Sequence, residues 1–173
     1  MQLIKDFNRL ILKDLKLEEG VVAGEIRKVS FGVAPYKGAP AAECEHLLER
    51  LCGWLSGPDF QSPDEDRRII TALVKAIIAH LYLEWIHPFG DGNGRTGRLI
   101  EFLILVSSGV PSPAAHLLSN QYNLTRTEYY HQLDRSSKSG GNPLPFIEYA
   151  LRGFVDGLRS QLCDIRNQQW NIA

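Results

Sequence analysis

The chain has 173 residues, of which 44% are hydrophobic and 23% charged, and its formal net charge is −1. This size and composition fit a single globular domain over residues 1–173 that buries a core without disulfides or metals. A protein that binds nucleic acid or a membrane surface needs a basic surplus, so neither partner is expected.

The three cysteines, Cys44, Cys52 and Cys163, form no CxxC pair and are odd in number. This pattern argues against a disulfide framework or a zinc site. The N-terminus alternates charged and apolar residues, unlike a signal peptide, and no apolar run has the length of a membrane span. We therefore expect a cytoplasmic protein.

Apolar residues recur at helical spacing over most of the chain, which predicts an all-α bundle. In chain order, helices are expected over 3–17, 41–55, 63–87, 95–108, 125–137 and 142–169, with a short turn or helix after Ser112. Capping boxes are expected at Ser62 with Glu65 and at Thr125 with Glu128. The apolar side chains expected on the inner face of the first helix are Phe7, Leu10, Ile11, Leu12 and Leu15.

Strand-like alternation occurs in one place, at Val29, Phe31 and Val33, and is followed by glycines and prolines typical of turns. This pattern predicts a small β-hairpin or extended flap over about 27–40. The expected fold is therefore an all-α helical bundle with one small β-hairpin.

The segment 87–98 concentrates glycine and polar residues between two apolar helices. Glycines let backbone N–H groups approach a ligand closely, and the start of a helix offers unpaired N–H donors to an anion. Arg95 and Arg98 lie three apart in the first turns of the second helix, where the helix dipole disfavours cations. A polyphosphate between the two arginines would resolve that conflict.

Three further side chains of this segment fit a phosphate reaction. Asp91 is a carboxylate of the kind that Mg²⁺ takes, Asn93 is a neutral donor for a phosphate oxygen, and His87 can accept a proton near neutral pH. Phe89 is interpreted as the apolar anchor of the loop, and His80 as a packed helix histidine.

Residues 87–98 resemble the signature of the Fic family, His-x-Phe-x-Asp/Glu-Gly-Asn-Gly-Arg-x-x-Arg, without a gap. The resemblance implies a Fic-type bundle, ATP as substrate, Mg²⁺ as cofactor and transfer of AMP to a Ser, Thr or Tyr hydroxyl of a target protein or of the chain itself. His87 would be the general base and Asp91 the metal ligand. Arg95 would grip the β- and γ-phosphates, and Arg98 would reach the γ-phosphate.

The resemblance also implies two larger sets of contacts. The nucleotide would lie against Gly90, Asp91, Gly92, Asn93, Gly94, Arg95, Thr96, Gly97, Arg98, Tyr129 and Tyr130. The flap would hold the backbone of the target through Ser30, Phe31, Gly32, Val33, Ala34, Pro35, Tyr36 and Lys37. Aromatic core packing is the alternative interpretation of Tyr129 and Tyr130.

At Gly92 and Gly94 the sequence follows the AMP-transferring branch of the family. The self-inhibiting motif of many members, Ser or Thr followed four residues later by Glu and then Gly or Asn, is not found in the sequence. An antitoxin-like partner or a preceding N-terminal segment is therefore expected to supply it. The alternatives are transfer of another nucleotide, such as UMP or GMP, and a non-catalytic nucleotide-binding regulator.

Overall fold

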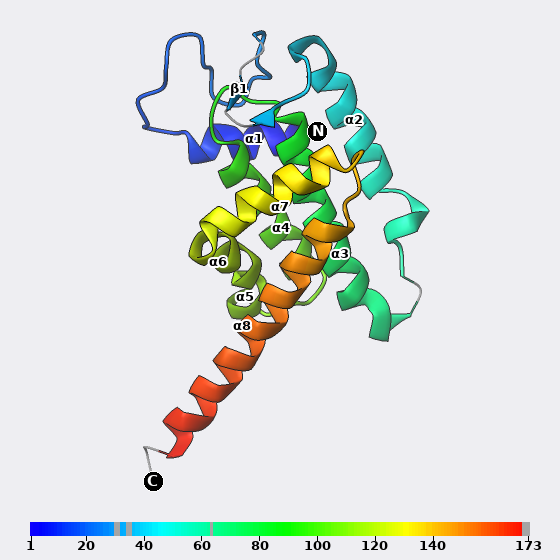
Figure 1. Cartoon of the computed structure of the whole chain (residues 1–173), viewed down its shortest axis with the longest axis vertical. Coiled ribbons are helices and arrows are strands. Elements are labelled where there is room, and N and C mark those ends of the chain that lie inside the picture. Colours follow the sequence, from blue (N-terminus) through cyan, green and yellow to red (C-terminus); the bar gives the residue numbers. More distant parts are fainter. Residues whose placement is uncertain (30–31, 34–35, 63, 171–173) are drawn as a thin grey trace. The chain divides into compact units, whose positions relative to one another are not determined.

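The computed structural model describes residues 1–29, 32–33, 36–62 and 64–170. The chain forms two compact units, Met1–Gly109 and Val110–Ala173. The expected all-α fold is confirmed, and Figure 1 labels the α-helices of both units and strand β1.

The first unit is built on two long helices, α3 (Glu65–Ile86) and α4 (Asn93–Ser107), which pack against each other. Helix α1 (Gln2–Ile11) packs on α4, and α2 (Cys44–Leu55) packs on α3. Short 3₁₀ turns, η1 (Ala41–Glu43) and η2 (Pro58–Phe60), flank α2. Burial of the apolar faces of these helices drives the packing. The fully buried residues of α3 include Ala76, Ile77, Leu81 and Leu83.

Helix α1 is shorter than the sequence predicts. It ends at Ile11, and Asp14 has a left-handed φ of 62° that no α-helix accepts. The predicted inner face is wrong in part, because Leu10 and Leu15 are exposed. Leu12 is buried as predicted, and Ile4 and Asn8 are buried with it, so this face of α1 carries a polar residue into the core.

Helix α3 begins at Glu65 and ends at Ile86, close to the predicted bounds. The Ser62 hydroxyl donates to the carbonyl oxygen of Asp64 at 2.8 Å, so it does not act as the expected cap acceptor. Pro63 lies outside the described residues. By length and composition alone, Arg67–Ile86 would pass for a membrane span, a test that the buried core helix of a bundle passes equally.

The predicted hairpin is confirmed in its described part. Strands β1 (Gly32–Val33) and β2 (Tyr36–Lys37) pair antiparallel, with Gly32 opposite Lys37 and Val33 opposite Tyr36. Ser30, Phe31, Ala34 and Pro35, which the sequence analysis also assigns to the flap, lie outside the described residues.

The second unit contains α5 (Ser112–Ala115), α6 (Leu117–Leu124), α7 (Arg126–Lys138) and α8 (Leu144–Trp170). Helices α6 and α7 pack on α8, and the core between them is a cluster of aromatic rings. Its members are Tyr122, Tyr129, Phe146 and Tyr149. Helix α6 was not predicted as a separate element.

The capping box expected at Thr125 is wrong, although α7 begins beside it at Arg126. The Thr125 hydroxyl lies 2.8 Å from the carbonyl oxygen of Gln121 and 2.6 Å from the Tyr149 hydroxyl. A contact between helices therefore replaces the local cap. The cysteines Cys44, Cys52 and Cys163 are free thiols, of which Cys44 is buried.

Candidate active site

The loop between α3 and α4 reverses the chain with two left-handed residues. His87 has a φ of 49° and Gly92 a φ of 79°. Left-handed backbone is unfavourable for a residue with a side chain, so the surroundings must hold His87 in place. Phe89, between them, is 1% exposed and forms a β-bridge with Ile26, which confirms its predicted role as the anchor of the loop.

Asn93 closes the loop from inside. Its side-chain oxygen accepts the Phe89 N–H at 2.9 Å, and its side-chain nitrogen donates to the Phe89 carbonyl oxygen at 2.9 Å. The side chain predicted to donate to a phosphate is thus already used by the loop in this structure. The backbone N–H groups at the start of α4 remain as donors that have no acceptor within the helix.

Asn8 of α1 fastens this loop to the rest of the unit. Its side-chain nitrogen donates to the carbonyl oxygen of Asp91 at 2.9 Å and lies 3.2 Å from the Thr96 hydroxyl oxygen. Its side-chain oxygen accepts the Gly24 N–H at 2.8 Å. Sequence analysis missed Asn8, because a single asparagine in an amphipathic helix carries no local sign of a distant partner.

His87 is partly buried beneath the hairpin segment. Burial lowers its pKa from the ordinary value of 6.5, and the charge of Arg27 lowers it further, while a hydrogen bond with the Glu84 backbone opposes the shift. The imidazole is therefore mainly neutral at pH 7, which is the state that a general base needs. A Cβ added to Gly38 would lie 2.7 Å from the Cβ of His87, so the hairpin segment packs directly on the histidine.

Arg27 is a second functional residue that sequence analysis missed. It is 7% exposed, and its Nε donates to the carbonyl oxygen of His87 at 2.7 Å. Its Nη atoms donate to the carbonyl oxygens of Val29 and Ala39, and its backbone N–H donates to that of Pro88 at 2.9 Å. Arg27 thus connects both ends of the hairpin segment to the histidine.

Asp91 and Arg95 form an ion pair at the mouth of the loop. Nη2 of Arg95 lies 3.0 Å from both carboxylate oxygens of Asp91, and both side chains are about half exposed. An exposed pair of this kind contributes little to stability and separates easily when ligands of each charge arrive. In the described part of the chain, no three acidic, cysteine or histidine side chains gather as a metal cluster. A single exposed carboxylate suits Mg²⁺, which takes its other oxygens from phosphates and water.

The first turns of α4 pack tightly on α3. The Thr96 hydroxyl donates to the carbonyl oxygen of Gly92 at 2.8 Å. A Cβ on Gly97 would lie 2.6 Å from Nδ1 of His80, so this glycine allows the two helices to approach closely. His80 is fully buried and lies 3.6 Å from a carboxylate oxygen of Glu101, which agrees with its interpretation as a packed helix histidine.

Tyr129 and Tyr130 belong to the second unit and differ in their surroundings. Tyr129 is 4% exposed within the aromatic cluster, whereas Tyr130 is 49% exposed and lies beneath the Arg126 guanidinium. Core packing therefore accounts for Tyr129. A nucleotide contact stays a prediction for both tyrosines.

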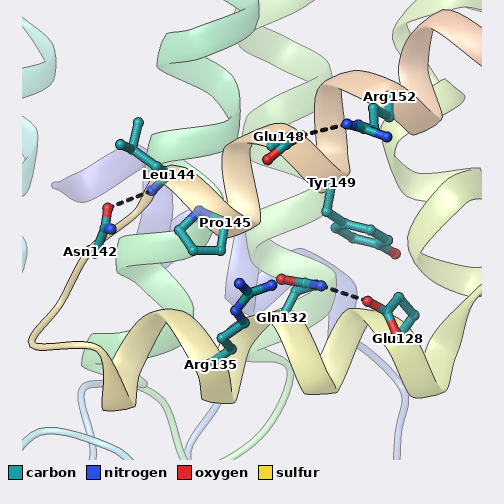
Figure 2. A pocket seen from close by; sticks show the side chains of 9 residues that line it. All are labelled: Glu128, Gln132, Arg135, Asn142, Leu144, Pro145, Glu148, Tyr149 and Arg152. Carbon is teal, nitrogen blue, oxygen red and sulfur yellow. Dashed lines mark hydrogen bonds and ion pairs between the residues drawn. The ribbon is translucent and has the colours of Figure 1, made fainter.

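The second unit also holds a cleft of about 450 Å³ between α7 and α8, shown in Figure 2. Its polar side chains largely bind one another. Gln132 donates to Glu128 at 2.6 Å, and Arg152 donates to Glu148 at 2.6 Å. The Arg152–Glu148 ion pair neutralises two of the charges that line the cleft, and Gln132 occupies an acceptor oxygen of Glu128.

Comparison with known proteins decides the family of the chain. Residues 1–105 match the Fic/DOC family. This chain belongs to the Fic/DOC family. The Fic match includes α1, the hairpin, α2, α3 and nearly all of α4, so it covers every residue of the loop 87–98. The resemblance drawn from the sequence is thus confirmed.

Curated and solved Fic proteins extend the likeness to most of the chain. A protein adenylyltransferase, fic-1, of Caenorhabditis briggsae is 35% identical over 155 residues, covering 88% of this chain and 27% of the relative. A Fic family protein from Desulfovibrio desulfuricans G20 superposes with a TM-score of 0.74 at 26% identity, covering 94% of this chain and 47% of the other. For fic-1 of Caenorhabditis elegans the TM-score is 0.68 at 26% identity, covering 96% and 44%. The chain spans about a quarter of the length of the curated relatives.

Proposed function

We propose that this chain carries out protein adenylylation, transferring AMP from ATP to a hydroxyl side chain of a protein. The observation that carries the proposal is the loop 87–98, which combines a neutral, partly buried His87 with the arginines and backbone donors at the start of α4. The names of curated relatives, protein adenylyltransferases over 84–88% of this chain, support the same reaction.

In the proposed reaction the target hydroxyl attacks the α-phosphorus of ATP while His87 accepts the proton of that hydroxyl. The new bond joins the hydroxyl oxygen to the α-phosphorus, the bond from the α-phosphorus to the bridging oxygen breaks, and pyrophosphate leaves. Arg95 and Arg98 neutralise charge on the leaving phosphates, and the N–H groups at the start of α4 bind the same anion.

Asp91 and Arg95 are proposed to exchange partners when the substrate binds. In the structure these two residues neutralise each other. On binding, Asp91 would hold Mg²⁺ and Arg95 would bind phosphate oxygens. Mg²⁺ held by Asp91 would supply positive charge that neutralises phosphate oxygens. The target backbone is proposed to pair with the hairpin, whose described strands have only each other as partners.

The proposal is tested by incubating the protein with α-³²P-ATP, Mg²⁺ and a cell lysate. We expect labelled protein bands with the wild type and none with His87→Ala. His46→Ala, which removes an exposed histidine of α2, is the matched control and should label as the wild type does. Label from γ-³²P-ATP instead of α-³²P-ATP would contradict AMP transfer. Stronger competition by unlabelled GTP or UTP than by ATP would assign the reaction to another nucleotide.

A further inference from the structure

Two opposite charges face the same empty position beside the loop. A Cβ built on Gly94 would lie 3.2 Å from Nη1 of Arg98 and 3.8 Å from Oε1 of Glu84. Arg98 is in the second turn of α4, and Glu84 is in the last turn of α3. Because Gly94 has no side chain, nothing of that residue separates the guanidinium from the carboxylate.

Glu84 is placed where its charge is costly. Its Oε1 has no solvent exposure and no hydrogen-bond partner among the described residues. Burial raises the pKa of Glu84 to about 7, and the charge of Arg98 opposes that rise. Arg98 is therefore the neighbour that favours the ionised carboxylate, and the carboxylate exchanges its proton near neutral pH.

Three other titratable side chains belong to this part of α3 and α4. The two histidines are mainly uncharged at neutral pH, and the carboxylate of Glu101 lies beside one of them. On α3, burial lowers the pKa of His80 to about 3 and also lowers that of His87. On α4, Glu101 lies beside His80 at 3.6 Å. Among the described residues, Arg98 is the one whose charge acts on Glu84.

We propose that Glu84 is a proton-controlled counter-ion of Arg98, and that the triphosphate of ATP competes with it for the guanidinium. The inference rests on the proposed function, because it requires Arg98 to contact the γ-phosphate. In this arrangement Glu84 is a positioning residue that acts through Arg98 and does not touch the nucleotide.

The direction of the effect follows from linkage. A phosphate bound at Arg98 places negative charge near Glu84 and raises the pKa of the carboxyl, so the protonated form of Glu84 binds ATP more tightly. As pH rises through about 7, Glu84 ionises and the affinity for ATP falls. A rise of one pKa unit on binding corresponds to about a tenfold difference in affinity between the two forms. AMP has no γ-phosphate and should show no such linkage.

The test compares dissociation constants of MgATP and AMP by calorimetry for the wild type and Glu84→Gln, at about pH 6 and about pH 8. The amide of the variant cannot ionise, so we expect it to bind MgATP about tenfold more tightly than the wild type at the higher pH and equally at the lower pH. AMP should bind both proteins equally at both pH values. Glu49→Gln, which replaces an exposed carboxylate of α2, is the matched control and should follow the wild type. ATP itself gains or loses protons between these pH values, but this affects both proteins equally and cancels in the ratio of their dissociation constants.

The inference is overturned if Glu84→Gln binds MgATP at the higher pH with the same affinity as the wild type, or more weakly. Neither result would contradict the proposed AMP transfer. A wild type that binds no MgATP would overturn both. If the variant does not fold, a ¹³C NMR titration of Glu84 in the wild type decides instead. The midpoint should move upward when MgATP is added, and an unchanged midpoint overturns the inference.

Discussion

The side-chain amide of Asn8 donates to the backbone carbonyl oxygen of Asp91 at 2.9 Å, across 83 positions of sequence. This bond joins the first helix of the chain to the loop that carries the proposed metal ligand. Asn8 is completely buried, so each of its hydrogen bonds replaces water that cannot reach the site.

Asn8→Ala should therefore destabilise the protein more than a usual surface substitution. It removes the bonds to Asp91 and Thr96 and leaves the buried Gly24 N–H without its acceptor. We expect a loss of about 2–4 kcal/mol in the free energy of unfolding, measured by urea denaturation, and weaker binding of MgATP. Asn142→Ala, which removes an exposed bond to the Leu144 N–H, is the control and should cost about 1 kcal/mol or less. Equal losses in the two variants would contradict the fastening role of Asn8.

Arg27 should control the pH dependence of the reaction through His87. The charge of Arg27 lowers the pKa of His87, so its removal raises that pKa. A general base acts in its neutral form, so activity is lost as pH falls through the pKa of His87. In Arg27→Met the acid limb of the kcat/KM profile should move to higher pH, and Lys28→Met, which removes an exposed charge from the next residue, should leave it in place. The same acid limb in both variants would show that Arg27 does not tune the base.

Arg27→Lys separates charge from geometry at the same position. Lysine keeps the positive charge but cannot reproduce the Nε and Nη bonds to the carbonyl oxygens of His87 and Val29. We expect the acid limb to stay close to that of the wild type, while kcat falls. An unchanged kcat would mean that the hydrogen bonds do not position His87.

Gly38→Ala should misplace the base with little effect on the nucleotide. The added methyl group would lie 2.7 Å from the Cβ of His87, which is closer than two non-bonded carbon atoms can approach, so one of the two residues must shift. We expect kcat for AMP transfer to fall by roughly tenfold to a hundredfold, with the dissociation constant of MgATP nearly unchanged.

Gly53→Ala is the matched control for Gly38→Ala, because a Cβ at Gly53 of α2 meets nothing within 4 Å. The control should keep full activity and gain up to about 1 kcal/mol of stability from the higher helix propensity of alanine. Loss of nucleotide binding in Gly38→Ala, in parallel with kcat, would indicate a general disturbance of the fold.

The sequence by itself determined the class of fold, the hairpin and the family signature of residues 87–98. Helical periodicity and the turn-forming prolines and glycines involve only a few neighbouring residues, so the sequence alone is enough to recognise them. The family signature is equally local, and the match over residues 1–105 confirms it. Local signals failed at Ser62 and Thr125, where a hydroxyl that would cap a helix binds another group instead.

Only the tertiary structure decided which residues support the site. Arg27 binds the carbonyl oxygen of His87 across 60 positions, and Asn8 reaches Asp91 across a still longer separation. Glu84 is three residues from His87 in sequence, yet its importance comes from burial and from Arg98 on the facing helix. Burial and electrostatic fields depend on what packs around a side chain, and a pattern of residue types along the chain does not specify that environment.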